Sequence, residues 1–208
     1  MLIKICGITR LEDAMEAANA GADVVGFNFW RPGKRYIAPE DAALIASAAS
    51  LPRTIRRVGV FVDEHLATVL EIALRVNLDV LQFHGSETPE YLNAIESRVK
   101  WKAIRVERDW SPATLANYTD VEAFLLDAAG ETPGGTGHTF DWNAAIAAKE
   151  YGRVILAGGL TPENVAEAVR TVRPWGVDVA SGVEDAPGIK NHQKLRDFIR
   201  AAREGETE

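Results

Sequence analysis

The segment Leu2–Phe29, LIKICGITRLEDAMEAANAGADVVGFNF, indicates how the rest of the chain folds. It holds two short runs rich in Val, Ile and Phe, which are typical of β-strands, on either side of an Ala- and Glu-rich run with helical periodicity. Strand, helix and strand in this order predict a βαβ unit with two parallel strands. The same alternation continues to the end of the chain.

Eight runs are predicted to be strands, and each is followed by a predicted helix. The strands are expected at Leu2–Ile8, Val24–Phe29, Arg57–Val62, Asp79–Phe83, Lys100–Val106, Glu122–Asp127, Arg153–Ala157 and Gly176–Ala180. The helices are expected to begin at Leu11, Pro39, Glu64, Thr88, Ser111, Asp141, Thr161 and Gly188, and the one at Ser111 has the weakest pattern. Eight βα units in 208 residues predict an α/β fold, a single (β/α)8 TIM barrel domain over residues 1–208. An open, doubly wound sheet is the alternative.

A weak internal repeat supports units of equal length. Asp23, Asp79 and Asp178 each precede a Val in a predicted strand or directly before it. Their spacings correspond to two and four units of about 25 residues, as expected for eight units in a barrel of this size.

Composition and charge narrow the class of protein. The 23 basic and 30 acidic residues give a net charge of −7, which disfavours a nucleic-acid or anionic membrane surface. Cys6 is the one cysteine, so no internal disulfide forms and a reducing compartment is expected. No signal peptide or membrane-spanning run is recognisable. We therefore expect a cytoplasmic protein, either a monomer or a homodimer.

The ends of the predicted strands carry candidate catalytic groups, because TIM barrels place their chemistry there. Alternation puts Lys4 and Cys6 on one face, where Cys6 is either a base or nucleophile in the barrel mouth or a small buried filler. A lysine inside the barrel needs a partner, for which Asp178 is the candidate; a solvated surface lysine is the alternative. Asp127 ends the sixth strand and is either a loop cap or an acid or base facing Cys6. Two proton-transfer groups on opposite sides of a small substrate suit an isomerisation.

Glycine clusters after strands six, seven and eight predict a phosphate site, because glycine lets backbone N–H groups approach phosphate oxygens. The cluster residues that we expect to bind are Gly135, Thr136, Gly137, Gly158, Gly159, Ser181 and Gly182. Tight turns are the ordinary alternative for each cluster taken singly.

Two further side chains are candidates for substrate binding. Arg35 is predicted to hold a carboxylate through two hydrogen bonds, with a solvated loop charge as the alternative. His84 is predicted to bind substrate or carry protons, although structural histidines are common. The sequence has no His or Cys spacing that predicts a zinc site, and nothing in it points to another metal or a cofactor.

A set of motifs in chain order carries a resemblance to one family. They are Lys4-Ile-Cys6-Gly-Ile-Thr9, Phe29 with Arg35-Tyr36, Val80-Leu-Gln82-Phe-His84-Gly85, Leu126-Asp127 with Gly134-Gly-Thr-Gly137, Leu156-Ala-Gly-Gly-Leu160 with Pro162, Asn164 and Val165, and Ser181-Gly-Val-Glu184 with Pro187-Gly188. Together they resemble phosphoribosylanthranilate isomerases, and the cysteine in the first strand separates that family from other phosphosugar barrels.

The resemblance implies an Amadori rearrangement without cofactor, on a phosphosugar joined to anthranilate, in tryptophan biosynthesis. It implies that Asp127 is the general acid that opens the ribose ring and that Cys6, as thiolate, is the general base at C2. Arg35 would hold the anthranilate carboxylate and the glycine clusters the phosphate. Apart from the resemblance, we expect Asp178 and His84 to contact substrate. A thiol has a reference pKa of about 8.5, so we expect the site, through Lys4, to lower it.

Two positions depart from the family pattern. Gly33-Lys34 replaces a usual Ser-Pro ahead of the arginine, which affects the loop that presents it. Asn191 stands where Asp is common, and we expect it to affect a helix cap and not catalysis.

Three other functions remain open at this point. Two are those of phosphosugar barrels: a metal-dependent ribulose-phosphate epimerase, and the aldose–ketose isomerase of histidine biosynthesis, whose first strand is expected to carry Asp in place of Cys. The third is a non-catalytic binder of a phosphate-bearing ligand. The absence of a metal-ligand pattern disfavours the epimerase.

Overall fold

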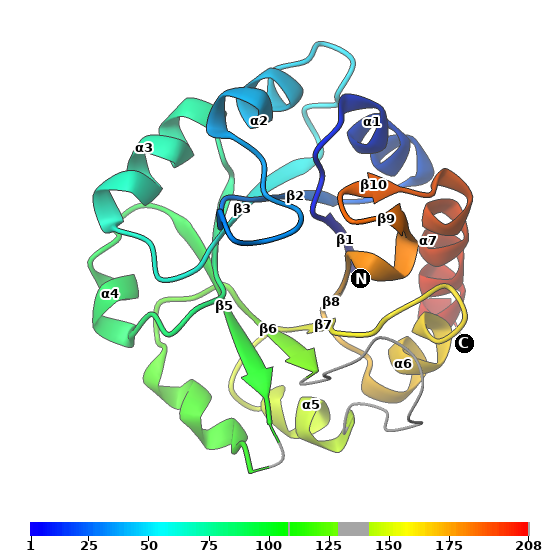
Figure 1. Cartoon of the computed structure of the whole chain (residues 1–208). Coiled ribbons are helices and arrows are strands. Elements are labelled where there is room, and N and C mark those ends of the chain that lie inside the picture. The colour runs from blue at the N-terminus through cyan, green and yellow to red at the C-terminus, as the bar shows by residue number, and fades with distance from the viewer. Residues whose placement is uncertain (108, 129–141, 208) are drawn as a thin grey trace.

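The computed structural model describes residues 1–107, 109–128 and 142–207. Eight parallel strands pair in chain order and close into a barrel, with β8 next to β1 (Figure 1). The strands are β1 Leu2–Cys6, β2 Val24–Asn28, β3 Arg56–Phe61, β4 Val80–Phe83, β5 Val99–Val106, β6 Ala123–Ala128, β7 Val154–Ala157 and β8 Gly176–Val179. The predicted closed barrel is confirmed, and the open sheet is excluded.

Helices surround the barrel, as Figure 1 shows along its axis. They are α1 Leu11–Ala20, α2 Pro39–Ala46, α3 Leu66–Val76, α4 Pro89–Asn93, α5 Trp142–Ala148, α6 Val165–Val172 and α7 His192–Thr207, with two 3₁₀ helices, η1 Pro112–Asn117 and η2 Ser181–Val183. The weak helix expected at Ser111 is η1, a short segment whose N-terminal amide at Ala113 donates to Ser111 Oγ. The expected helix start at Asp141 lies outside the described residues.

The last predicted helix begins later than expected. Instead of starting at Gly188, the chain forms an antiparallel hairpin of β9 Glu184–Ala186 and β10 Ile189–Lys190, and only then α7. Gly188 adopts φ of 81°, a left-handed conformation that the turn of the hairpin requires. The predicted cap role of Asn191 is confirmed, because its Oδ1 accepts a hydrogen bond from Lys194 N in the first turn of α7 at 2.9 Å.

The core has two layers because side chains alternate between the two faces of each strand. Inside the barrel lies a cluster of Val24, Val58, Val60, Val80, Trp101, Ala103, Ala123, Leu125, Ile155 and Ala157, with Cys6 packed against it. A larger cluster between the strands and the helices includes Ile3, Ile5, Leu81 and Phe83. This alternation places Lys4 and Cys6 on the inner face of β1, and Gln82 on the inner face of β4.

The aspartate repeat is confirmed at two of its three positions. Asp23 and Asp79 precede β2 and β4, and each accepts a hydrogen bond from the backbone of a neighbouring strand, at Ile3 N and Arg57 N respectively. Asp178 lies within β8 and accepts a hydrogen bond from a side chain instead. The prediction that it occupies the same place as Asp23 and Asp79, at the start of a strand, is therefore wrong.

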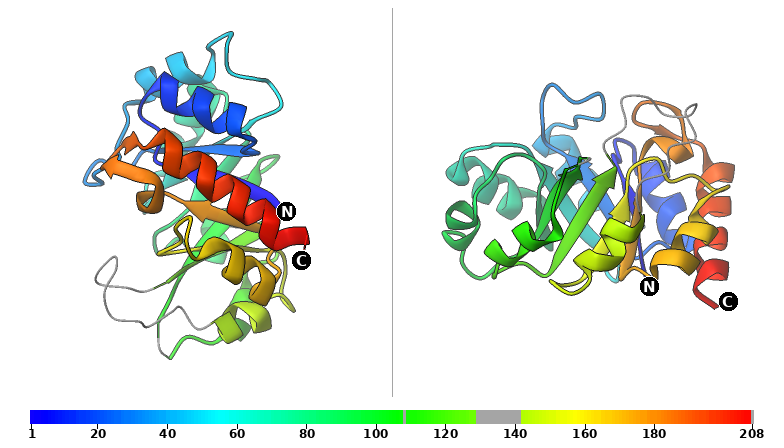
Figure 2. Two further views of the ribbon diagram at one scale, coloured as in Figure 1. Left: turned by 90° about the vertical axis from the view of Figure 1, so that its right-hand side faces the viewer. Right: turned by 90° about the horizontal axis from the view of Figure 1, so that it is seen from below.

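The two ends of the barrel differ. The β2–α2 loop and the β9–β10 hairpin stand at the end where the strands finish, and both chain termini lie at the other end (Figure 2, right). Among the described residues, no helix has the length and apolar character needed to cross a membrane.

Candidate active site

Lys4 and Asp178 form an ion pair inside the barrel. They are partners in register on β1 and β8, and Lys4 Nζ donates to Asp178 Oδ1 at 2.9 Å. The Lys4 side chain is 0% exposed, which excludes a solvated surface role. The predicted pairing is confirmed. Because removing one partner would leave the other charge buried and alone, the pair holds both side chains in place at the base of the mouth.

Cys6 ends β1 on the inner face and is partly exposed. Gly26 on β2 provides the space for it, since a Cβ at Gly26 would lie 3.0 Å from the Cys6 sulfur and 3.0 Å from Lys4 Cε. The sulfur is therefore next to the lysine and not sealed in the apolar core. Nothing in the sequence had distinguished Gly26 from an ordinary strand glycine.

The charge state of Cys6 differs from the sequence-based expectation. Burial raises the pKa of the Cys6 thiol above its ordinary value, and the negative charge of Asp178 acts in the same direction. Lys4 and Lys190 act in the opposite direction, but they do not outweigh burial. The expected lowering of the pKa is thus wrong for the protein without substrate, in which the thiol is mostly protonated at neutral pH.

The two members of the buried pair are expected to move the pKa of Cys6 in opposite directions. Lys4→Met removes the cation and raises it, whereas Asp178→Asn removes the anion, leaves Lys4 charged and lowers it. The pH dependence of alkylation by iodoacetamide measures this directly, because Cys6 is the one thiol in the chain. The double variant should fall between the two. Shifts of the same sign in both single variants would contradict this electrostatic account.

Asp127 is the fifth residue of β6 and is hydrogen-bonded to His84, which follows β4. His84 Nε2 lies 3.2 Å from Asp127 Oδ2, and Gln82 Nε2 lies 3.2 Å from His84 Nδ1. With the Gln82 amide in this orientation its nitrogen donates to Nδ1, so the proton of His84 is on Nε2, which donates to the carboxylate. Gln82 therefore sets the tautomer of His84. Its Oε1 is the only buried side-chain polar atom without a hydrogen-bond partner among the described residues.

Cys6 and Asp127 lie on different sides of the mouth. Their strands are three positions apart around the ring, and both side chains are near the C-terminal strand ends. Asp127 is in register with Arg105 of β5. This arrangement places a thiol and a carboxyl group on different sides of the mouth, as an acid–base reaction on two faces of a small molecule requires.

Arg35 is bound to a residue that sequence reasoning did not select. Its Nε and Nη2 donate to the carboxylate of Glu184, with distances of 2.8, 3.0 and 2.6 Å. One edge of the guanidinium is therefore occupied, and only the other edge is left for a further acceptor. In the sequence Glu184 belongs to the motif Ser181-Gly-Val-Glu184, but no role was predicted for it. Its contact with Arg35 could not be predicted because the two residues are 149 positions apart in the chain.

The glycines after β7 and β8 form two loops in contact. Gly158 and Gly159 have φ of 78° and 67°, and a Cβ at Gly159 would meet nothing within 4 Å. A Cβ at Gly182 would lie 2.0 Å from Leu160 O, so only glycine allows the two loops to approach this closely. Ser181 and Gly182 belong to η2. The predicted binding residues Gly135, Thr136 and Gly137 lie outside the described part of the chain.

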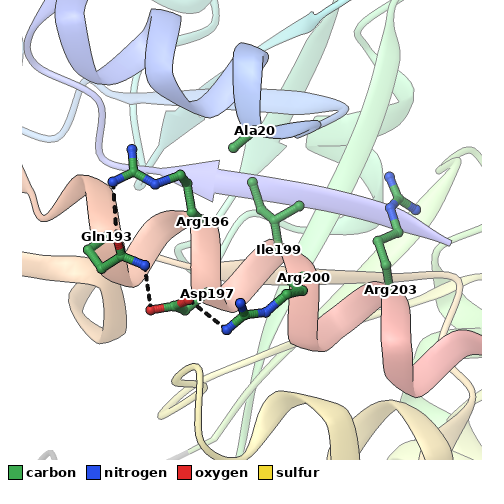
Figure 3. A pocket seen from close by; sticks show the side chains of 7 residues that line it. All are labelled: Ala20, Gln193, Arg196, Asp197, Ile199, Arg200 and Arg203. Carbon is green, nitrogen blue, oxygen red and sulfur yellow. Dashed lines mark hydrogen bonds and ion pairs between the residues drawn. The ribbon is translucent and has the colours of Figure 1, made fainter.

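A separate surface pocket lies between α1 and α7 and has a volume of about 400 Å³ (Figure 3). It is lined by Ala20, Gln193, Arg196, Asp197, Ile199, Arg200 and Arg203. Arg203 donates to Asp23, which precedes β2, so the pocket is on the outside of the barrel and away from the strand ends where Cys6 and Asp127 lie. In the described ranges, no three His, Cys, Asp or Glu side chains converge as metal ligands would.

Comparison with known proteins decides the family. The model of the N-(5'-phosphoribosyl)anthranilate isomerase family matches residues 3–201. The chain belongs to this isomerase family. The N-(5'-phosphoribosyl)anthranilate isomerase of Geobacter metallireducens is 50% identical over 97% of this chain and 98% of its own.

Solved structures of the family have the same fold. The phosphoribosyl anthranilate isomerase of Thermotoga maritima has a TM-score of 0.90, is 43% identical and covers 98% of this chain and 99% of its own. A crystal structure of phosphoribosyl anthranilate isomerase in complex with reduced 1-(o-carboxyphenylamino)-1-deoxyribulose 5-phosphate has a TM-score of 0.88, is 40% identical and covers 98% of both chains. A family member thus binds this reduced phosphosugar derivative on the same fold.

Proposed function

We propose that this chain converts N-(5'-phosphoribosyl)anthranilate into 1-(2-carboxyphenylamino)-1-deoxyribulose 5-phosphate, a step of tryptophan biosynthesis. The observation that carries the proposal is the pair of proton-transfer groups, Cys6 and Asp127, on separate sides of the mouth of a barrel of this family. That the reaction takes place in the cytoplasm stays a prediction.

Asp127 would supply the proton for the first step. A protonated carboxyl group donates to the ring oxygen, the bond between C1 and that oxygen breaks, and the nitrogen lone pair forms a C1–N iminium. His84 occupies Oδ2 of Asp127, which leaves Oδ1 to meet the ring oxygen. The Gln82–His84 contact thus orients the acid.

Cys6 would remove the proton from C2 in the second step. The electron pair of the broken C–H bond moves into the iminium, which gives an enolamine that tautomerises to the 2-ketone. The iminium is itself the electron acceptor for this step. The base must be the thiolate, and Lys4 is the cation that stabilises it against the cost of burial.

The binding groups would hold the two ends of the substrate. The phosphate would lie against the backbone of Gly158, Gly159, Ser181 and Gly182, because these two glycine-containing loops are in contact with each other after β7 and β8. The anthranilate carboxylate would meet the free edge of Arg35. Asp178, held by its ion pair with Lys4, would have a supporting role beside the substrate.

An assay of substrate consumption tests the proposal. Phosphoribosylanthranilate is fluorescent through its anthranilate group, and we expect its signal to fall with added protein at a rate that a chelator leaves unchanged. Turnover of ribulose 5-phosphate that requires a metal, or turnover of only the histidine-pathway substrate, would contradict it. Tight binding of the reduced product analogue without any turnover would indicate a binder instead of an enzyme.

A further inference from the structure

Glu184 begins β9, and its side chain is almost fully buried, with 5% exposed. Besides the two nitrogens of Arg35, its Oε1 accepts from Lys190 Nζ at 2.8 Å and from Gly188 N at 3.2 Å. Two cations and one backbone amide therefore fix the carboxylate. Ion pairs on the surface are exposed to water and contribute little to holding a side chain in place. The Glu184 carboxylate, in contrast, is buried and has three separate hydrogen-bond donors.

Lys190 is itself held in place, so Glu184 has little freedom to rotate. Lys190 Nζ also donates to Ala180 O at 3.1 Å, at the end of β8. Its backbone N donates to Asp13 Oδ2 at 3.1 Å, which ties the hairpin to α1. The side chain of Lys190 is 0% exposed. The anchor of Arg35 is thus a rigid part of the barrel and not a flexible loop.

Arg35 passes over the residue that follows the thiol. Its side chain crosses Gly7, where an added Cβ would lie 2.5 Å from Arg35 Cδ, and Gly7 has φ of 73°. Gly7 follows Cys6 directly. The edge formed by Nε and Nη2 faces Glu184, and within the described residues no group accepts a hydrogen bond from Nη1. The Arg35 side chain is 25% exposed, and its charge lies within electrostatic range of Cys6.

Arg35, Lys190 and Glu184 together carry a net positive charge. Burial alone would raise the pKa of Glu184, but hydrogen bonds from Arg35 and Lys190 lower it below its usual value. The hydrogen bonds that Arg35 donates to Glu184 raise the pKa of Arg35. One anion thus lies between two cations, so the net charge of +1 attracts an anionic ligand, and the fixed guanidinium determines where the ligand binds.

We propose that Glu184 is a positioning residue that sets specificity for the aromatic carboxylate of the substrate. It occupies the Nε edge of Arg35 and so holds the terminal edge toward the mouth, where it meets that carboxylate. Without Glu184 the guanidinium is free to rotate, and Arg35 and Lys190 repel each other. The inference rests on the proposed function, since it names how this site selects a carboxylated substrate.

The test compares two ligands that differ only in the carboxylate. One is the reduced product analogue, and the other is the same compound made from aniline. In the unaltered protein the first should bind more tightly. In Glu184→Gln, which keeps the shape and loses the charge, the ratio of the two affinities should fall by about tenfold or more, the size expected for a charged hydrogen bond. KM should rise while kcat changes by no more than about threefold.

Asp185→Asn is the matched control, because Asp185 is the next residue on β9, is exposed and loses the same charge. It should leave the ratio unchanged. Equal weakening of both ligands in Glu184→Gln would show that Glu184 only stabilises the hairpin, and an unchanged ratio would show that it has no role. Either result overturns the inference.

Two results separate this inference from the proposed function. In the first, the unaltered protein isomerises its substrate, and both it and Glu184→Gln discriminate between the two ligands equally well. Only the proposed role of Glu184 is then wrong. If the unaltered protein binds both ligands equally, carboxylate recognition fails as a whole. Should Glu184→Gln not fold, Glu184→Asp provides the same measurement, because its shorter carboxylate cannot hold the guanidinium in the same place, and its ratio should also fall.

Discussion

Replacing Cys6 with serine is expected to lower kcat by about 10²- to 10⁴-fold, the usual contribution of a general base. A serine hydroxyl is nearly the same shape as the thiol but is a far weaker acid, so it is not deprotonated beside Lys4. Stopped-flow fluorescence of phosphoribosylanthranilate measures the loss. Affinity for the reduced product analogue should stay within about twofold, because the sulfur acts on a proton and contributes little to binding.

The pH profile gives this variant its internal control. Burial holds the pKa of Cys6 above its ordinary value, so the thiolate fraction of the unaltered protein grows as pH rises through that pKa. Its kcat/KM should therefore rise with pH over the same range, and the rise should disappear in Cys6→Ser. A serine variant with full activity, or one with an unchanged pH profile, would remove Cys6 from the chemistry.

Replacing Asp127 with asparagine should cost a similar factor, about 10²- to 10⁴-fold in kcat. The amide oxygen of asparagine can still accept the hydrogen bond from His84 Nε2, so the geometry is retained while the acidic proton is lost. The measurement is again substrate consumption, with analogue affinity as the check on binding.

The step that Asp127 serves can be told apart from the step that Cys6 serves. Ring opening precedes removal of the C2 proton, so a substrate deuterated at C2 should show a smaller isotope effect on kcat in Asp127→Asn than in Cys6→Ser. The reverse order, or an asparagine variant that loses less than about tenfold, would contradict the assignment of the acid.

Much of the fold and part of the site could be predicted because they follow from local periodicity. The period of two along β1 placed Lys4 and Cys6 on one face, and closure of eight units placed β8 beside β1, so the Lys4–Asp178 pair followed. The hairpin of β9 and β10 could not be predicted in this way, because strands of three and two residues show no periodicity.

The remaining features depend on contacts between distant loops or on a balance of opposing effects. Arg35 and Glu184 come from the loop after β2 and the segment after β8, and no pattern within either segment indicates the other. The pKa of Cys6 depends on whether burial or the nearby lysines dominate, which only three-dimensional distances decide. Gln82 could have been found, since alternation puts it on the same face as His84.

The most direct test of the two-group mechanism is a crystal structure of this protein with reduced 1-(o-carboxyphenylamino)-1-deoxyribulose 5-phosphate. The account predicts that the Cys6 sulfur lies about 3–3.5 Å from C2 of the sugar chain. It also predicts the Asp127 carboxyl group across the chain from that sulfur, beside the oxygen that derives from the ring. An analogue bound with both groups on one side of it, or with C2 out of reach of the sulfur, would contradict the mechanism.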